Sequence, residues 1–152
     1  MQTRRKTLQH SATVAGLLAA TGMFPGMALA FNAKAFEAKN IADAIKAIGA
    51  GAPQESKDVT ITGPDIAENG AVVPLGAATG LAGVKQLLIL VEKNPNALAA
   101  IFNVTDSVEA NILTRAKMGQ TSDVYAVAIM GDGKVLYAQK EVKVTQIGRA
   151  HV

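Results

Sequence analysis

The residue types that most often perform chemistry in proteins are scarce in this chain of 152 residues. It has no cysteine, and its two histidines, His10 and His151, lie near the two ends. The stretch from Phe31 to Thr145 therefore contains neither an imidazole nor a thiol. For that stretch, this excludes a Cys/His nucleophile pair, a zinc site of the usual kind and a haem-attachment motif.

Carboxylates are the remaining candidates for a metal site or an acid/base pair. Asp65 and Glu68 are spaced three residues apart, as are Asp106 and Glu109. Each pair lies among turn-forming residues, where carboxylates are usually solvated. We therefore expect no metal ligand, no cofactor and no catalytic residue, and we predict that the chain is not an enzyme.

Two other pairs suggest a site less strongly. Arg115 and Lys117 share a predicted strand face and could attract an anion or an acidic partner, although a solvated basic face is the more common outcome. Met118 and Met130 could suggest copper or haem ligation, but methionines near apolar strand positions usually pack in a core. We assign no site to any of the four.

The first thirty residues are expected to be a signal peptide. Adjacent Arg4 and Arg5 precede an apolar run at 12–24, and Ala28 and Ala30 stand where a signal peptidase reads small residues. The segment TRRKTLQ resembles the twin-arginine export motif, although an ordinary secretion signal also has a basic start. The run is too short for a membrane anchor, which needs about 20 apolar residues. We predict cleavage after Ala30, export to the periplasm and no membrane association afterwards.

Cleavage would change the charge balance of the chain. The signal peptide removes Arg4, Arg5 and Lys6, and the tail at 146–152 holds Arg149. Fifteen basic residues less these four leave 11 against 12 acidic ones in residues 31–145, a charge of about −1. The formal charge of +3 for the whole chain therefore gives no reason to expect a nucleic-acid partner.

The hydrophobic period changes along the expected mature chain. From Ala33 to Gly51, apolar residues recur at spacings of three and four, which predicts one amphipathic helix with its main segment starting at Asn40. Asp43 makes a loose variant of a capping box there. From about residue 57 the period is two, and Asp132-Gly133 is expected to close the last hairpin. The predicted strands are 58–62, 71–77, 84–92, 97–104, 111–118, 122–130 and 134–145.

These elements predict an all-β fold. We expect an immunoglobulin-like β-sandwich of about seven strands at 57–145, preceded by one N-terminal α-helix and a linker at 31–56. The run LLILV at 87–91 is apolar on both faces of its strand. One face is expected to fill the sandwich, and the other to be covered by a partner, by the N-terminal helix or by a loop.

Four segments together resemble a known family. They are ITGPDIAENGAVVPL (61–75), VEKNPNALAAIF (91–102), RAKMGQTSDVYAV (115–127) and DGKVLYAQKEVKVT (132–145). In this order they resemble SoxY, the sulfur-carrier subunit of the periplasmic Sox system for thiosulfate oxidation. PDIAENGAVVP is the most specific part, and a twin-arginine signal is usual in the family.

The resemblance implies an immunoglobulin-like fold, a heterodimer with SoxZ and a carrier role without turnover of its own. In the family the last strand runs into a Gly-Gly-Cys-Gly-Gly arm, whose cysteine bears the sulfur. A c-type cytochrome conjugates thiosulfate to it, a hydrolase releases sulfate, and a sulfane dehydrogenase oxidises the remaining sulfur. The resemblance would make thiosulfate the anion that Arg115 and Lys117 could attract.

The chain departs from the family where that arm should begin. After Thr145 it reads QIGRAHV, and no cysteine follows. Because IGRAHV matches one reading frame of a widely used sequencing adapter, we expect 146–152 to be an artefact and the carrier cysteine to lie beyond Thr145. One alternative is a carrier-dead paralogue that kept the fold, and a further option is that His151 is a substitute acceptor or metal ligand, although a terminal histidine without partners makes a weak site. Another is an exported immunoglobulin-like interaction module associated with a periplasmic quinoprotein system.

Overall fold

The computed structural model describes residues 32–145, in which a compact unit begins at Ala33. Within the described residues, no helix has the length and apolar character needed to cross a membrane. Several predicted residues lie outside this part: Arg4, Arg5, Ala28 and Ala30 of the expected signal peptide, and His151 in the tail at 146–152.

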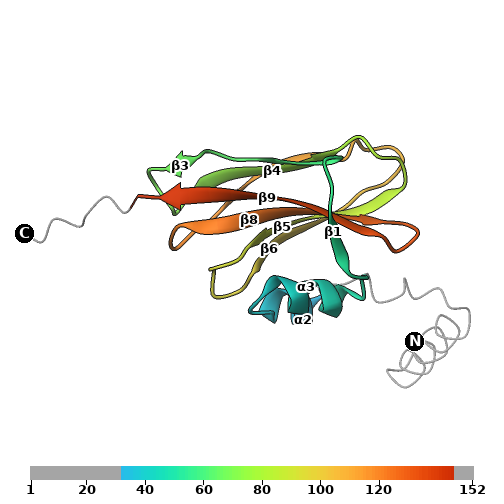
Figure 1. Ribbon diagram of the computed structural model, residues 1–152, viewed down its shortest axis with the longest axis horizontal. Coiled ribbons are helices and arrows are strands. Elements are labelled where there is room, and N and C mark those ends of the chain that lie inside the picture. Colours follow the sequence, from blue (N-terminus) through green and yellow to red (C-terminus); the bar gives the residue numbers. More distant parts are fainter. Residues whose placement is uncertain (1–31, 146–152) are drawn as a thin grey trace, which may run out of the picture. The chain divides into compact units, whose positions relative to one another are not determined.

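Two helices precede nine strands in the described part of the chain (Figure 1). The helices are α2 (Ala33–Glu37) and α3 (Ile41–Ile48). The strands are β1 (Pro53–Glu55), β2 (Val59–Thr62), β3 (Ile66–Ala67), β4 (Val73–Thr79), β5 (Val84–Val91), β6 (Leu98–Asn103), β7 (Asn111–Ala116), β8 (Ser122–Met130) and β9 (Val135–Val144).

The strands form two sheets that pack face to face. The larger sheet has the order β1-β9-β8-β5-β6, with β3 also paired to β9, and the smaller has the order β2-β4-β7. Strands β1 and β3 run parallel to β9, and the other pairs are antiparallel. Figure 1 shows β4 above the larger sheet and both helices below it. The predicted all-β, immunoglobulin-like sandwich with an N-terminal helical region is confirmed.

Strand β5 supplies apolar side chains to both faces of the larger sheet. Leu87, Ile89 and Val91 are buried in a cluster between the two sheets. Leu88 and Leu90 are buried in a second cluster with residues of α2 and α3. Burying each such side chain contributes about 1.5–3 kcal/mol. Of the alternatives for the second face of LLILV, the N-terminal helical segment is therefore the one that covers it.

The prediction of a single helix at 33–51 is wrong, because the segment forms two. The break lies before Asn40, whose backbone is extended (φ −139°, ψ 166°). The Ala38 carbonyl accepts a hydrogen bond from the Ala97 N–H at 3.0 Å, which ties the break to the residue before β6. The predicted start at Asn40 is confirmed, since its Oδ1 accepts from the Asp43 N–H at 2.8 Å and its Nδ2 donates to the Asp43 carboxylate at 2.7 Å.

All seven predicted strands are confirmed, with each end within two residues of its predicted place. The structure adds β1 and β3, which the pattern missed because β1 is exposed throughout and β3 is two residues among turn formers. The Asp132-Gly133 hairpin is also confirmed. Gly133 has a φ of 91°, which favours glycine, and the Lys134 N–H donates to the Asp132 side chain at 3.0 Å.

Candidate functional site

The last strand, β9, is held along both of its edges. Along one edge it pairs with β8 from Val135 to Val142. Along the other, β1 pairs with its first three residues and β3 with Lys143 and Val144. Strand ends usually fray unless they are tied down. Here β8 pairs with β9 as far as Val142 and β3 pairs with the two residues that follow, so the direction of the strand is fixed to its end.

Main-chain hydrogen bonds from β3 and its neighbours hold the final residues of β9. The N–H groups of Lys143 and Thr145 donate to the carbonyls of Asp65 and Ala67, each at 3.0 Å. The Thr145 hydroxyl also donates to the Ala67 carbonyl, at 3.4 Å. Ala67 is buried, so this contact is part of the packed structure and not a solvent-exposed turn.

The opposite edge is held by the loop that precedes β8. The Val144 N–H donates to Thr121 Oγ1 at 3.0 Å. Because alternate N–H groups of a strand point to opposite edges, the three bonds together satisfy every N–H from 143 to 145. We call these contacts the exit clamp, and its members are Asp65, Ala67, Thr121, Lys143, Val144 and Thr145.

An ion pair adds a side-chain contact to the exit clamp. Lys140 Nζ lies 2.9 Å from Asp65 Oδ1 and donates to the Gly63 carbonyl at 2.6 Å. The hydrogen bond from Lys140, together with its charge, lowers the pKa of Asp65 below the ordinary value of 3.8. Asp65 is exposed, so water screens the pair and its contribution to stability is small.

Replacing Lys140 with methionine should raise the pKa of Asp65 toward 3.8. Because the folded-state pKa is the lower one, the pair stabilises the fold above pH 3.8 and loses this effect as the pH falls through the folded value. Carboxyl carbon NMR titration of Asp65 measures the change. Lys134→Met, which breaks the exposed Asp132 pair, is the control and should leave Asp65 unchanged. If the titration midpoint of Asp65 is the same in Lys140→Met as in the parent protein, this role of Lys140 is contradicted.

Gly70 brings the loop after β3 against β9. Its carbonyl accepts a hydrogen bond from the Met118 N–H at 2.7 Å. A Cβ at this position would overlap the Met118 carbonyl oxygen and would lie 2.8 Å from Val144 Cγ1. No side chain fits without movement of the backbone, so glycine is required for this close approach.

Comparison with known proteins assigns the family. Residues 45–148 match the family model of the sulfur oxidation protein SoxY. The chain belongs to the SoxY family. A solved structure, that of the sulfur carrier protein SoxY from Chlorobium limicola f thiosulfatophilum, is 34% identical with a TM-score of 0.60, over 69% of this chain and 96% of that chain. The resemblance stated from the four segments is confirmed.

Two superoxide reductases are similar in fold. One, also called neelaredoxin, is from Ignicoccus hospitalis, with a TM-score of 0.51 and 15% identity over 57% of this chain and 80% of that chain. The other, described as putative, is from Thermotoga maritima, with a TM-score of 0.51 and 8% identity over 65% and 97%. Comparison with curated proteins gave no match.

The segment on which the resemblance to the SoxY family rests most strongly forms one side of the exit clamp. PDIAENGAVVP spans residues 64–74, which include Asp65, Ala67 and Gly70. The sequence did not reveal their roles, because Asp65 and Ala67 act mainly through backbone carbonyls and any residue type has one. The resemblance of this segment to the SoxY family was the available signal.

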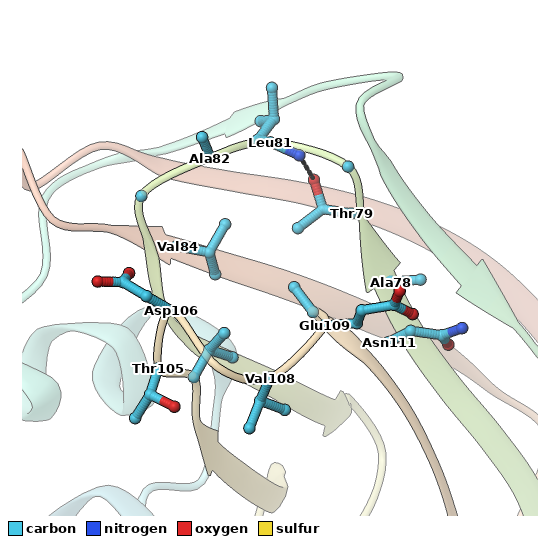
Figure 2. Close-up of a pocket in the computed structure, with 14 residues that line it drawn as sticks. Ala78, Thr79, Leu81, Ala82, Val84, Thr105, Asp106, Val108, Glu109 and Asn111 are labelled. Atoms are coloured by element: carbon cyan, nitrogen blue, oxygen red, sulfur yellow. Dashed lines mark hydrogen bonds between the residues drawn. The ribbon is translucent and has the colours of Figure 1, made fainter.

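The structure separates the two carboxylate pairs. Asp65 belongs to the exit clamp and pairs with Lys140, whereas Glu68 is exposed. Asp106 and Glu109 line a cavity of about 570 Å³. Figure 2 shows their carboxylates pointing in different directions. Within the described residues, no three Asp, Glu, His or Cys residues are grouped to hold a metal ion.

That cavity lies at the end of the sandwich opposite the exit clamp. The loops at 78–84 and 104–111 line it, where β4 and β6 end and β5 and β7 begin. Strand β9 starts at that end and finishes at the clamp, and its ten residues span about 33 Å. The cavity is therefore remote from whatever follows Thr145.

The two methionines and the basic pair have different surroundings. Met118 is buried in the core between the sheets, and Met130 packs against that core, so both act in packing. Arg115 and Lys117 are exposed and line a second cavity, of about 290 Å³, between β6 and β7. The basic pair therefore faces a recess and not only open solvent.

Proposed function

We propose that this protein is a periplasmic sulfur carrier, which holds thiosulfate-derived sulfur covalently on a cysteine after Thr145 and presents it to separate enzymes. The exit clamp is the observation that supports this best. It fixes β9 up to Thr145 by hydrogen bonds on both edges. A chain segment that follows Thr145 would therefore leave the sandwich from a rigid base, as a carrier arm requires.

The chemistry of such an arm follows from its composition. Glycines on both sides of a cysteine leave the backbone nearly unrestricted. Five extended residues reach roughly 17 Å, enough to enter a pocket of another protein. A thiol with a pKa of about 8.5 supplies some thiolate at neutral pH, the form that attacks sulfur. The rest of the chain has no cysteine with which the arm could form a disulfide.

The tail at 146–152 is foreign to the natural protein in this proposal. Gln146 to Val152 contains no cysteine, so the chain as written cannot carry sulfur on a thiol. We propose that these residues are translated adapter sequence and that the natural gene continues differently after Thr145. Resequencing the 3′ end of the gene tests this, and genomic reads that encode QIGRAHV followed by a stop codon would refute it.

The proposal includes the partners and location expected for the family. The carrier would form a heterodimer with SoxZ and contact a c-type cytochrome, a sulfate-releasing hydrolase and a sulfane dehydrogenase in turn. It would reach the periplasm through the twin-arginine pathway, with cleavage after Ala30. It would perform no turnover itself, because each chemical step belongs to a separate enzyme.

The decisive experiment restores the arm. Gly-Gly-Cys-Gly-Gly replaces residues 146–152, and the protein is co-expressed with SoxZ and treated with thiosulfate and the conjugating cytochrome. We expect a thiosulfonate adduct on the new cysteine by mass spectrometry. A Gly-Gly-Ser-Gly-Gly arm is the matched control and should give none. Co-purification with SoxZ without any adduct would instead favour the interaction module.

A further inference from the structure

A cleft opens along the side of the sandwich where both sheets end in a free strand. In the described residues β6 pairs only with β5, and β7 only with β4. The cleft between them is lined by small and apolar residues of both strands, and its volume is about 290 Å³. One water occupies about 30 Å³ in the liquid, so the cleft has room for a tetrahedral oxyanion with part of its hydration shell.

The charged residues that line this cleft are all basic. They are Arg115 and Lys117, and no Asp or Glu lines it. Lys39 adds a third cation at the rim, because its Nζ donates to Oδ1 of the lining residue Asn96 at 3.0 Å. The salt bridges in the described part of the chain involve Lys134 and Lys140, so the cations of the cleft lack a carboxylate partner there.

This charge is a local feature of the cleft. Residues 31–145 hold nearly equal numbers of basic and acidic residues, 11 and 12. A cleft whose charged lining residues are all basic therefore does not follow from the composition. Cations that line a recess attract anions from solution. A guanidinium matches two oxygens of an oxyanion in a bidentate geometry, and a nearby ammonium adds a point charge.

The cleft lies at the same end of the sandwich as the exit clamp. Asn94, which lines the cleft, donates through Nδ2 to the Lys117 carbonyl at 2.7 Å. Lys117 begins the loop that ends at Thr121, which accepts from Val144. Three strand spacings separate β9 from β6 in the sheet order, about 14 Å. The cysteine is the third residue of the arm, so its Cα lies up to about 10 Å from Thr145, and its side chain with the attached thiosulfonate adds about 6 Å. The sulfonate therefore reaches the β6 side of the cleft.

We propose that the cleft binds the sulfonate group of thiosulfate, either free or attached to the arm as a cysteine S-thiosulfonate. Arg115 would hold two sulfonate oxygens, and Lys117 would supply a second charge. The loaded arm would fold back onto its own sandwich between visits to enzymes. The binding of free thiosulfate is independent of the proposed carrier function, whereas the folding back of a loaded arm rests on it.

The first test uses thiosulfate alone with the purified protein. An NMR titration should show saturable shifts at Ala99, Thr114 and Ala116, with a Kd on the order of 10 mM, as expected for exposed charges. Arg115→Gln/Lys117→Gln should weaken binding at least tenfold. Lys57→Gln/Lys134→Gln has the same charge change at the opposite end and should change the Kd less than twofold. Equal weakening in the two variants, or no saturation, would overturn the proposal.

The second test places the same anion on the arm. In the protein with the Gly-Gly-Cys-Gly-Gly arm, the cysteine thiolate attacks an inner sulfur of tetrathionate. The central S–S bond breaks, Cys–S–S–SO₃⁻ forms and thiosulfate leaves, so that atoms and charge balance. The phosphine reductant TCEP should then cleave the adduct at least threefold faster in Arg115→Gln/Lys117→Gln than in the parent. Equal rates would overturn the folding back of the arm.

Failure of the cleft proposal can be distinguished from failure of the proposed carrier function. Tetrathionate loading needs no Sox enzyme, and the thiosulfate titration needs no arm. If the cytochrome fails to load the arm while thiosulfate still binds the cleft, the carrier function fails and the oxyanion site stands. If the cytochrome loads the arm and thiosulfate does not bind the cleft, the oxyanion site is refuted and the carrier function stands.

Discussion

Replacing Gly70 with valine should lower the free energy of unfolding by about 3 kcal/mol, in the upper range for overpacked sites. The new side chain would overlap the Met118 carbonyl oxygen and press on Val144, so the loop after β3 would have to move away from β9. For a domain of this size the loss corresponds to a fall in Tm of about 12 °C. Denaturant and thermal unfolding measure it.

Gly119→Val is the matched control for this prediction. Gly119 lies in the loop beside Met118, and a Cβ there would meet no atom within 4 Å. We expect a change below about 0.5 kcal/mol, as for most surface substitutions. In Gly70→Val, amide exchange should also accelerate at Val144 and Thr145 more than in the centre of β8. Similar unfolding of the two variants would show that the close approach at Gly70 is unimportant.

Replacing Ile45 with aspartate should have the second large effect, a loss of about 4 kcal/mol. Ile45 is 2% exposed and packs with Leu88 and Leu90 of β5 in the cluster under the helices. The substitution removes apolar burial and places a carboxylate without a partner against that cluster. Since domains have only about 5–15 kcal/mol of stability, the helices should detach or the whole domain should unfold.

Two measurements distinguish these outcomes. Binding of a hydrophobic dye reports exposure of the face that α2 and α3 cover, and urea unfolding reports global stability. Ala42→Asp adds the same charge at an exposed position of α3 and should change neither by much. If Ile45→Asp unfolds like the parent and binds no more dye, then the helices are not required to cover the larger sheet.

The fold was predictable because the apolar residues of its core recur along the sequence with the periods of strands and helices. Alternation located the seven main strands, and the continuous run at 87–91 indicated a strand buried on both faces. The cover of the second face was not predictable, because the pattern of α3 shows an apolar stripe and not the surface on which it packs. The break before Asn40 depends on a long-range hydrogen bond from Ala97, which local patterns do not contain.

The candidate site was predictable only as a location. The resemblance indicated that the region after Thr145 matters, but the residues that hold β9 in place were not apparent. Asp65 and Ala67 contribute backbone carbonyls, and Gly70 contributes the absence of a side chain. The cleft was missed for another reason, since Arg115 and Lys117 become its lining only when β6 and β7 of different sheets are brought together.

The exit clamp also determines how concentrated a tethered group is around the sandwich. Because Thr145 is held by Ala67, a thiosulfonate on the cysteine, the third residue of the arm, moves within about 16 Å of one fixed point. One molecule spread evenly through a hemisphere of that radius corresponds to an effective concentration of roughly 0.2 M. A site with a Kd on the order of 10 mM would then be occupied most of the time by the tethered group. Weak binding at the cleft would be enough to retain cargo, and would still release it to a partner that binds more tightly.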